Sequence, residues 1–145
     1  MQKSIVSVLF LIFGAAISFS GEATLKVERP WIFAVPPNAQ DTAAFMTLVN
    51  PGPTPLRVTG GRTDVADRVA PMVTTKTEGR LGMKDVPFIE VPAGGRTVLV
   101  PGGDHLMLYG LKNPLKPGQS VTLILLLESG GTLEVSAVVS RREPQ

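Results

Sequence analysis

After residue 23 the chain alternates short apolar runs with turns that are rich in glycine and proline, of which the whole chain has 15 and 13. The segments NPGPTP, PAGG, PGG, KPGQ and SGG are typical of turns. The runs between them lack a helical period, and several short strands at this spacing predict an antiparallel all-β sandwich or barrel. The expected strands are TLKVE, AAFMTLVN, LRVTGG, FIEV, RTVLV, HLMLYG, SVTLILLLE and TLEVSAVV. SVTLILLLE is almost continuously apolar, which predicts a central strand.

The first twenty residues have a different pattern. Lys3 is followed by an apolar run from Ile5 to Ile17, and small residues follow. This pattern predicts a secretory signal peptide over residues 1–20, with cleavage as late as residue 23, and a single domain over residues 21–145. An uncleaved N-terminal anchor is the alternative, although the run is short for a membrane span. Either arrangement places the mature chain, without a stable span, in the periplasm or elsewhere outside the cytoplasmic membrane.

Composition excludes several classes of function. The chain contains no cysteine, so disulfides, thiolate metal sites, cysteine nucleophiles and a cysteine-linked lipid are absent. A net charge of +2 and no basic run longer than Arg141–Arg142 argue against a nucleic-acid partner. One histidine is too few for a metallohydrolase, and the aspartates have turn-like contexts, so an enzyme is not expected. These aspartates are Asp64, Asp67, Asp85 and Asp104.

The only histidine lies in the predicted strand HLMLYG. Side chains alternate between the two faces of a strand. If Leu106 and Leu108 point into the core, His105, Met107 and Tyr109 point the other way. His105 and Met107 could then converge on one small ion, or they could be a surface histidine and a methionine that fills a gap.

The other methionines extend this pair into a longer pattern. Ten residues separate Met72 from Met83, and twenty-one separate Met83 from His105, which precedes Met107 by one intervening residue. Met46 stands apart, in AAFMTLVN, and is expected in the core. Thioether sulfur is soft and neutral, so it suits Cu(I) and not Zn²⁺, Mg²⁺ or Ca²⁺, and a single imidazole should bind Cu(II) poorly.

This spacing resembles the signature of the periplasmic copper chaperone family called PCuAC, which is His or Met, ten residues, Met, twenty-one residues, His, one residue, Met. ADRVAPMV and VPAGGRTVLVPGGDHLMLYGLKNPLKPGQSVTLIL are similar to its most characteristic segments. Many members have His at the first position, where this chain has Met72.

The resemblance implies a cupredoxin-like Greek-key β-sandwich or barrel that binds one Cu(I) per chain. The implied ligands are Met72, Met83, His105 and Met107, with Met72 and Met83 flanking a hairpin whose turn is Thr77–Arg80. The implied function is a monomeric Cu(I) chaperone that delivers copper to the copper A centre of cytochrome c oxidase subunit II, or to another copper-receiving protein.

Other interpretations of the same residues stay open. A copper resistance or storage protein would use the same ligands, and a metal-free β-sandwich could be an interaction module. A blue-copper electron carrier needs a cysteine and two histidines, so it is excluded. Arg62 and Arg68 could guide a partner or be solvated charges, and Trp31 could shield the metal or belong to the core.

Overall fold

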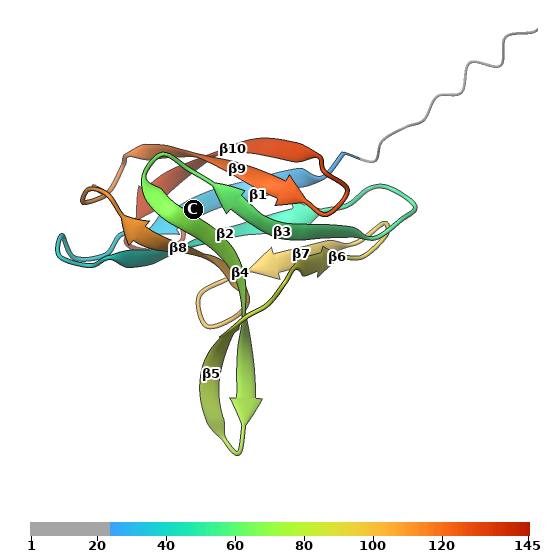
Figure 1. Cartoon of the computed structure of the whole chain (residues 1–145), viewed down its shortest axis with the longest axis horizontal. Coiled ribbons are helices and arrows are strands. Elements are labelled where there is room, and N and C mark those ends of the chain that lie inside the picture. Colours follow the sequence, from blue (N-terminus) through green and yellow to red (C-terminus); the bar gives the residue numbers. More distant parts are fainter. Residues whose placement is uncertain (1–23) are drawn as a thin grey trace, which may run out of the picture.

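In a computed structural model, residues 24–145 are described, and the predicted signal peptide over residues 1–20 lies outside them. The described part forms ten strands and contains no helix that could cross a membrane (Figure 1). The strands are β1 (Lys26–Phe33), β2 (Asp41–Val49), β3 (Leu56–Arg62), β4 (Ala66–Thr77), β5 (Arg80–Asp85), β6 (Ile89–Val91), β7 (Arg96–Leu99), β8 (His105–Leu111), β9 (Ser120–Leu127) and β10 (Thr132–Ser140).

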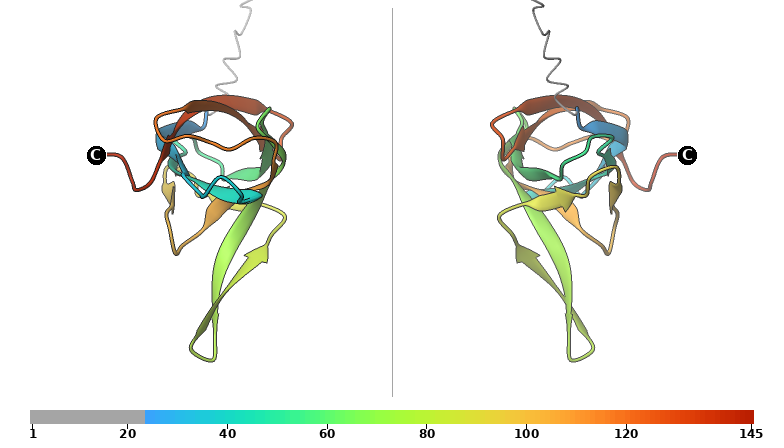
Figure 2. Two further views of the ribbon diagram at one scale, coloured as in Figure 1. Left: turned by 90° about the vertical axis from the view of Figure 1, so that its left-hand side faces the viewer. Right: turned by 90° about the vertical axis from the view of Figure 1, so that its right-hand side faces the viewer.

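Seven of the strands close into a barrel in the order β4-β8-β2-β1-β10-β9-β3 (Figure 2). Closure occurs where β3 returns to β4, with Gly61 opposite Val69. The β1–β10 pair is parallel and the other pairs are antiparallel. Strands β5, β6 and β7 are additions that pair with β4, β3 and β2. The all-β prediction is therefore confirmed.

The barrel interior is filled by every second side chain of each strand, as the pleat requires. In β8, Leu106 and Leu108 are fully buried inside, as predicted, and Met46 of β2 is also in the core. Strand β9, from the apolar run SVTLILLLE, lies between β10 and β3 and has no free edge. Only alternate residues of its first part are buried, because Thr122 and Ile124 point away from the interior.

A bulge in β1 determines which aromatic side chains reach the outer face. Arg29 has a positive φ of 48°, and the register of β1 against β2 shifts by one residue between Glu28 and Trp31. Because a shift of one residue exchanges the two faces of a strand, Ile32 enters the core and Trp31 lies outside it, opposite Phe45.

The hairpin formed by β4 and β5 projects away from the barrel (Figures 1 and 2). The first part of β4 pairs with β8, and its last six residues, from Met72 to Thr77, pair with β5. At the tip, Glu78 and Gly79 both have positive φ values, 51° and 77°, as a two-residue hairpin turn of the favoured twist requires. The predicted turn at Thr77–Arg80 is confirmed.

Asn50 offers a test of this fold, because its fully buried side chain connects the turn after β2 to β6. Its Nδ2 donates to the carbonyls of Thr54 (2.7 Å) and Val91 (3.1 Å), and its Oδ1 accepts from the Gly52 amide. We expect Asn50→Ala to lower the free energy of unfolding by about 2–3 kcal/mol, measured by urea denaturation, since buried groups lose their partners.

The matched control is Asn38→Ala, because Asn38 is exposed and makes no side-chain hydrogen bond within residues 24–145. This variant should change stability by no more than about 0.5 kcal/mol. Equal effects of the two substitutions would contradict the structural role assigned to Asn50.

Candidate metal centre

The pairing of β4 with β8 brings three of the four predicted ligands together. Met72 lies directly opposite His105, and Met107 lies opposite Ala70, one step along the same face. Side chains directly opposite each other on neighbouring strands have Cβ atoms about 5 Å apart. Because Leu106 and Leu108 occupy the interior, these three side chains lie on the outer face of the barrel, as the sequence predicted for His105 and Met107.

Met83 joins them from the projecting hairpin. It lies opposite Thr74 of β4, and Thr74 shares a face with Met72 two residues earlier. Met83 is therefore diagonal to Met72 on the outer face. The three neighbouring strands β5, β4 and β8 thus carry all four predicted ligands on one side of the sheet.

The four side chains differ strongly in exposure. His105 and Met72 are buried, at 3% and 9% exposure, whereas Met107 is half-buried and Met83 is 64% exposed. The cluster is therefore open to solvent mainly on the side of Met83. The cluster has a closed end on the barrel and an open end on the hairpin.

Hydrogen bonds fix the imidazole of His105. Its Nδ1 lies 2.9 Å from the carbonyl oxygen of Gly103 and can only donate to it. The Thr74 hydroxyl donates to the same carbonyl at 2.8 Å, and the Thr74 amide donates to Asp104 Oδ1 at 3.3 Å. These contacts join the turn before β8 to β4. With Nδ1 occupied, Nε2 keeps its lone pair, as a metal-ligating histidine requires.

Two aromatic rings, those of Phe45 and Trp31, lie beside the imidazole of His105. The centroids of the Phe45 and His105 rings are 6.1 Å apart. The Trp31 ring packs against Phe45 at a tilt of 41°, with 4.8 Å between ring centroids. Trp31 is buried although it points out of the barrel. Strand β2 lies between Trp31 on β1 and His105 on β8, so Trp31 does not border the cluster itself. It packs against Phe45 of β2, which contacts His105. Such an apolar boundary limits the access of water to a metal site.

The charged residue Arg68 belongs to the same face. Its guanidinium lies 4.1 Å above the Tyr109 ring and 3.7 Å from Asp85 Oδ2. The Tyr109 hydroxyl donates to Asp85 Oδ1 at 2.9 Å. Partial burial, and then this hydrogen bond, raise the pKa of Tyr109 above its usual value, so the phenol stays a donor at neutral pH.

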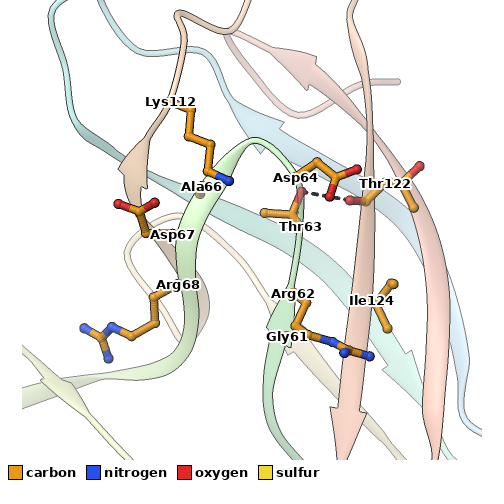
Figure 3. Close-up of a pocket in the computed structure, with 10 residues that line it drawn as sticks. All are labelled: Gly61, Arg62, Thr63, Asp64, Ala66, Asp67, Arg68, Lys112, Thr122 and Ile124. Atoms are coloured by element: carbon orange, nitrogen blue, oxygen red, sulfur yellow. Dashed lines mark hydrogen bonds between the residues drawn. The ribbon is translucent and has the colours of Figure 1, made fainter.

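Arg62 and Arg68 both line a cleft beside the β3–β4 turn, and none of the four predicted ligands lines this cleft. Figure 3 shows the side chains of Arg62 and Arg68 pointing away from each other. These two arginines therefore do not point at a common ligand in this cleft.

The donor atoms of the cluster suit a soft cation. Within residues 24–145 there is no group of three or more His, Cys, Asp or Glu that could hold a metal ion. The cluster instead offers three thioether sulfurs and one imidazole nitrogen. Neutral, soft donors fit Cu(I) and do not fit Mg²⁺ or Ca²⁺, which prefer oxygen.

Solved structures identify the class of fold. The solution structure of CuI-DR1885 from Deinococcus radiodurans has a TM-score of 0.67 and 40% identity, and the match covers 88% of this chain and 86% of that one. The apo form of DR1885 matches at 41% identity with a TM-score of 0.63, covering 85% of this chain and 83% of that one. The copper-bound PCuAC domain from PmoF2 has a TM-score of 0.67 at 22% identity, covering 80% of this chain and 92% of that one, and it shows the fold alone. The barrel is a cupredoxin-like fold of the PCuAC type, as expected.

Sequence comparison gives the family. A family model described as "Putative lipoprotein LpqE-like" matches residues 25–139, and the chain belongs to this LpqE-like family. The protein described as "Putative lipoprotein Lxx21020" from Leifsonia xyli subsp. xyli is 32% identical over 116 residues, which is 79% of this chain and 69% of that protein.

The orientation of His105 can be tested directly, because the chain has a single histidine. We expect the neutral imidazole of the metal-free protein to carry its proton on Nδ1, since Gly103 accepts a hydrogen bond there. Long-range ¹⁵N–¹H NMR spectra of ¹⁵N-histidine-labelled protein distinguish the two nitrogens. Protonation of Nε2 instead would contradict the proposed availability of that atom to a metal.

Proposed function

We propose that this protein is an extracytoplasmic Cu(I) chaperone that binds one copper ion and passes it to a partner by ligand exchange. The proposed ligands are Met72, Met83, His105 and Met107. The observation that carries the proposal is the convergence of these four soft donors on one outer face of β5, β4 and β8, with Nε2 of His105 left free.

The gradient of exposure supports transfer as the role of the site. A carrier must hold copper firmly and still allow an incoming ligand to reach it. Met83, exposed on the hairpin, is the ligand that a partner can replace first, while His105 and Met72 are held in the barrel wall. Cu(I) accepts three or four ligands and has little geometric preference, so a stepwise exchange is feasible without large rearrangement.

The comparisons support the copper assignment. The solved Cu(I) form of DR1885 belongs to a protein 40% identical to this one. Cytochrome c oxidase subunit II, with its copper A centre, is the receiver we propose, on the basis of the PCuAC signature in this sequence. The apolar segment of residues 1–20 and the lipoprotein descriptions of the relatives support a location outside the cytoplasmic membrane.

Cu(I) binding is tested by anaerobic titration of residues 21–145 in competition with a coloured Cu(I) chelator. We expect one equivalent to bind tightly, and the double variant Met83→Leu Met107→Leu to bind at least about 100-fold more weakly, because two of four ligands are lost. Met46→Leu is the control, since Met46 is inside the barrel. A wild-type domain that does not compete for Cu(I) would leave the metal-free interaction module as the function.

The role of His105 as a ligand is tested by substitution. His105→Ala should bind Cu(I) more weakly than the wild type in the same chelator competition, because one of the four proposed ligands is lost. An unchanged affinity for Cu(I) in His105→Ala would exclude His105 as a ligand.

Transfer separates a chaperone from a storage protein. We expect the Cu(I)-loaded protein to give its copper to the soluble apo domain of oxidase subunit II within minutes of mixing. The two proteins are then separated, and the copper content of each is measured. Retention of copper, at a binding affinity confirmed by the chelator, would instead favour a storage or resistance role.

A further inference from the structure

The hairpin that carries Met83 has few attachments to the barrel. All six residues of β5 are exposed, and among residues 24–145 the backbone of β5 pairs only with β4. Just after β5, the Val86 amide donates to the carbonyl of Pro71, which again belongs to β4. Backbone hydrogen bonds therefore attach β5 to β4 alone, and the outer half of β4 is held to the turn before β8 by the Thr74 contacts with Gly103 and Asp104.

A side-chain contact connects β5 to β8 directly. The Tyr109 hydroxyl, from β8, donates to Asp85 at the end of β5, and Arg68 of β4 both stacks on the Tyr109 ring and faces the Asp85 carboxylate. We call Arg68, Tyr109 and Asp85 the hairpin latch. Its members come from the same three strands that carry the four proposed ligands.

The latch lies next to the ligands along each strand. Asp85 is two residues from Met83 and lies opposite Met72, and Tyr109 is two residues from Met107. Residues two apart on a strand share a face. Fixing Asp85 against Tyr109 therefore fixes the direction in which the Met83 side chain leaves β5.

The hydrogen bond from Tyr109 is the effective part of the latch. The Arg68–Asp85 pair is 3.7 Å apart with both side chains at least half exposed, and such surface pairs contribute little. A phenol that donates to a carboxylate at 2.9 Å makes a charge-assisted hydrogen bond, which is stronger and more directional. Arg68 contributes mainly by holding the ring of Tyr109 in place.

We infer that Tyr109 and Asp85 are positioning residues, which hold the β4–β5 hairpin at the angle that brings Met83 to Met72, His105 and Met107. The inference rests on the proposed function, because it assigns these residues a role in the same copper site. Opening of the latch releases Met83 from copper and leaves the three ligands of β4 and β8 in register, so the latch acts on one ligand only.

The test uses Tyr109→Phe, which removes the hydroxyl and keeps the ring beneath Arg68. We expect its Cu(I) affinity to be about 5- to 20-fold lower than that of the wild type, as the loss of one charge-assisted hydrogen bond implies. The loss should disappear, to within about twofold, when Met83→Leu is already present, and it should persist in a Met107→Leu background.

The matched control is Glu90→Gln. Glu90 accepts from Arg57, which stacks on Phe88 at 4.3 Å, so this cluster resembles the latch but contains no neighbour of the proposed ligands. Copper affinity should not change in this variant. A loss of affinity in Tyr109→Phe that is equally large with and without Met83→Leu would overturn the inference, because it would show a general effect on the barrel.

A second measurement needs no copper. In the metal-free protein, Tyr109→Phe should speed hydrogen exchange of the β5 amides by about 5- to 20-fold, the factor expected for the loss of Cu(I) affinity. The amides of β1 and β2 should exchange as in the wild type. If the wild-type protein fails to bind Cu(I), the proposed function is wrong. The exchange experiment still shows whether the Tyr109–Asp85 contact holds the β4–β5 hairpin in place. Unchanged exchange in β5 would overturn it.

Discussion

The antiparallel register between β4 and β8 is the constraint on which the site depends. Met72 faces His105 outside the barrel only because Pro71 faces Leu106 inside it. A slip of one residue would send the leucines of β8 to solvent and the proposed ligands into the core, at a cost of several buried side chains. The hydrophobic core therefore sets the relative position of three donors, and the cluster needs no bound ion to bring their strands together.

The fourth donor, Met83, is positioned by the length of β4 and by the turn of the hairpin, and not by the barrel core. Strand β4 is long enough to serve both the barrel and the projecting hairpin, so one continuous backbone links the buried Met72 to the exposed Met83. The two-residue turn at Glu78 and Gly79 fixes the register of β5 and hence the face on which Met83 lies. Rigidity at His105 and accessibility at Met83 are thus set by the two halves of one strand, β4, which pair with β8 and with β5. This division suits an ion that must be both held and released.

Much of this arrangement follows from the sequence, and the remainder depends on tertiary contacts. Alternation in HLMLYG correctly placed His105 and Met107 outside the core, and the motif placed the hairpin turn. The chain from Ala66 to Asp85 was not recognised as two strands from its pattern, because β5 is exposed on both faces and has no alternation. Asp85 was interpreted as one of the aspartates in turn-like contexts, which is wrong: it ends β5 and accepts from Tyr109. The position of Asp85 two residues after Met83, on the same face of an extended strand, could have indicated that it lies beside the predicted ligands.

Charge gives the last reason for a site at the edge of the barrel. Three thioethers and a neutral imidazole leave the full positive charge of Cu(I) uncompensated, and an isolated buried charge is costly. The aromatic rings of Trp31 and Phe45 close only one side of the cluster. On the others, Asp85 lies opposite Met72 and Asp104 precedes His105, so two carboxylates lie next to the proposed ligands. A soft, neutral ligand set can therefore bind a cation here because solvent at Met83 and nearby negative charge reduce the cost of desolvating it.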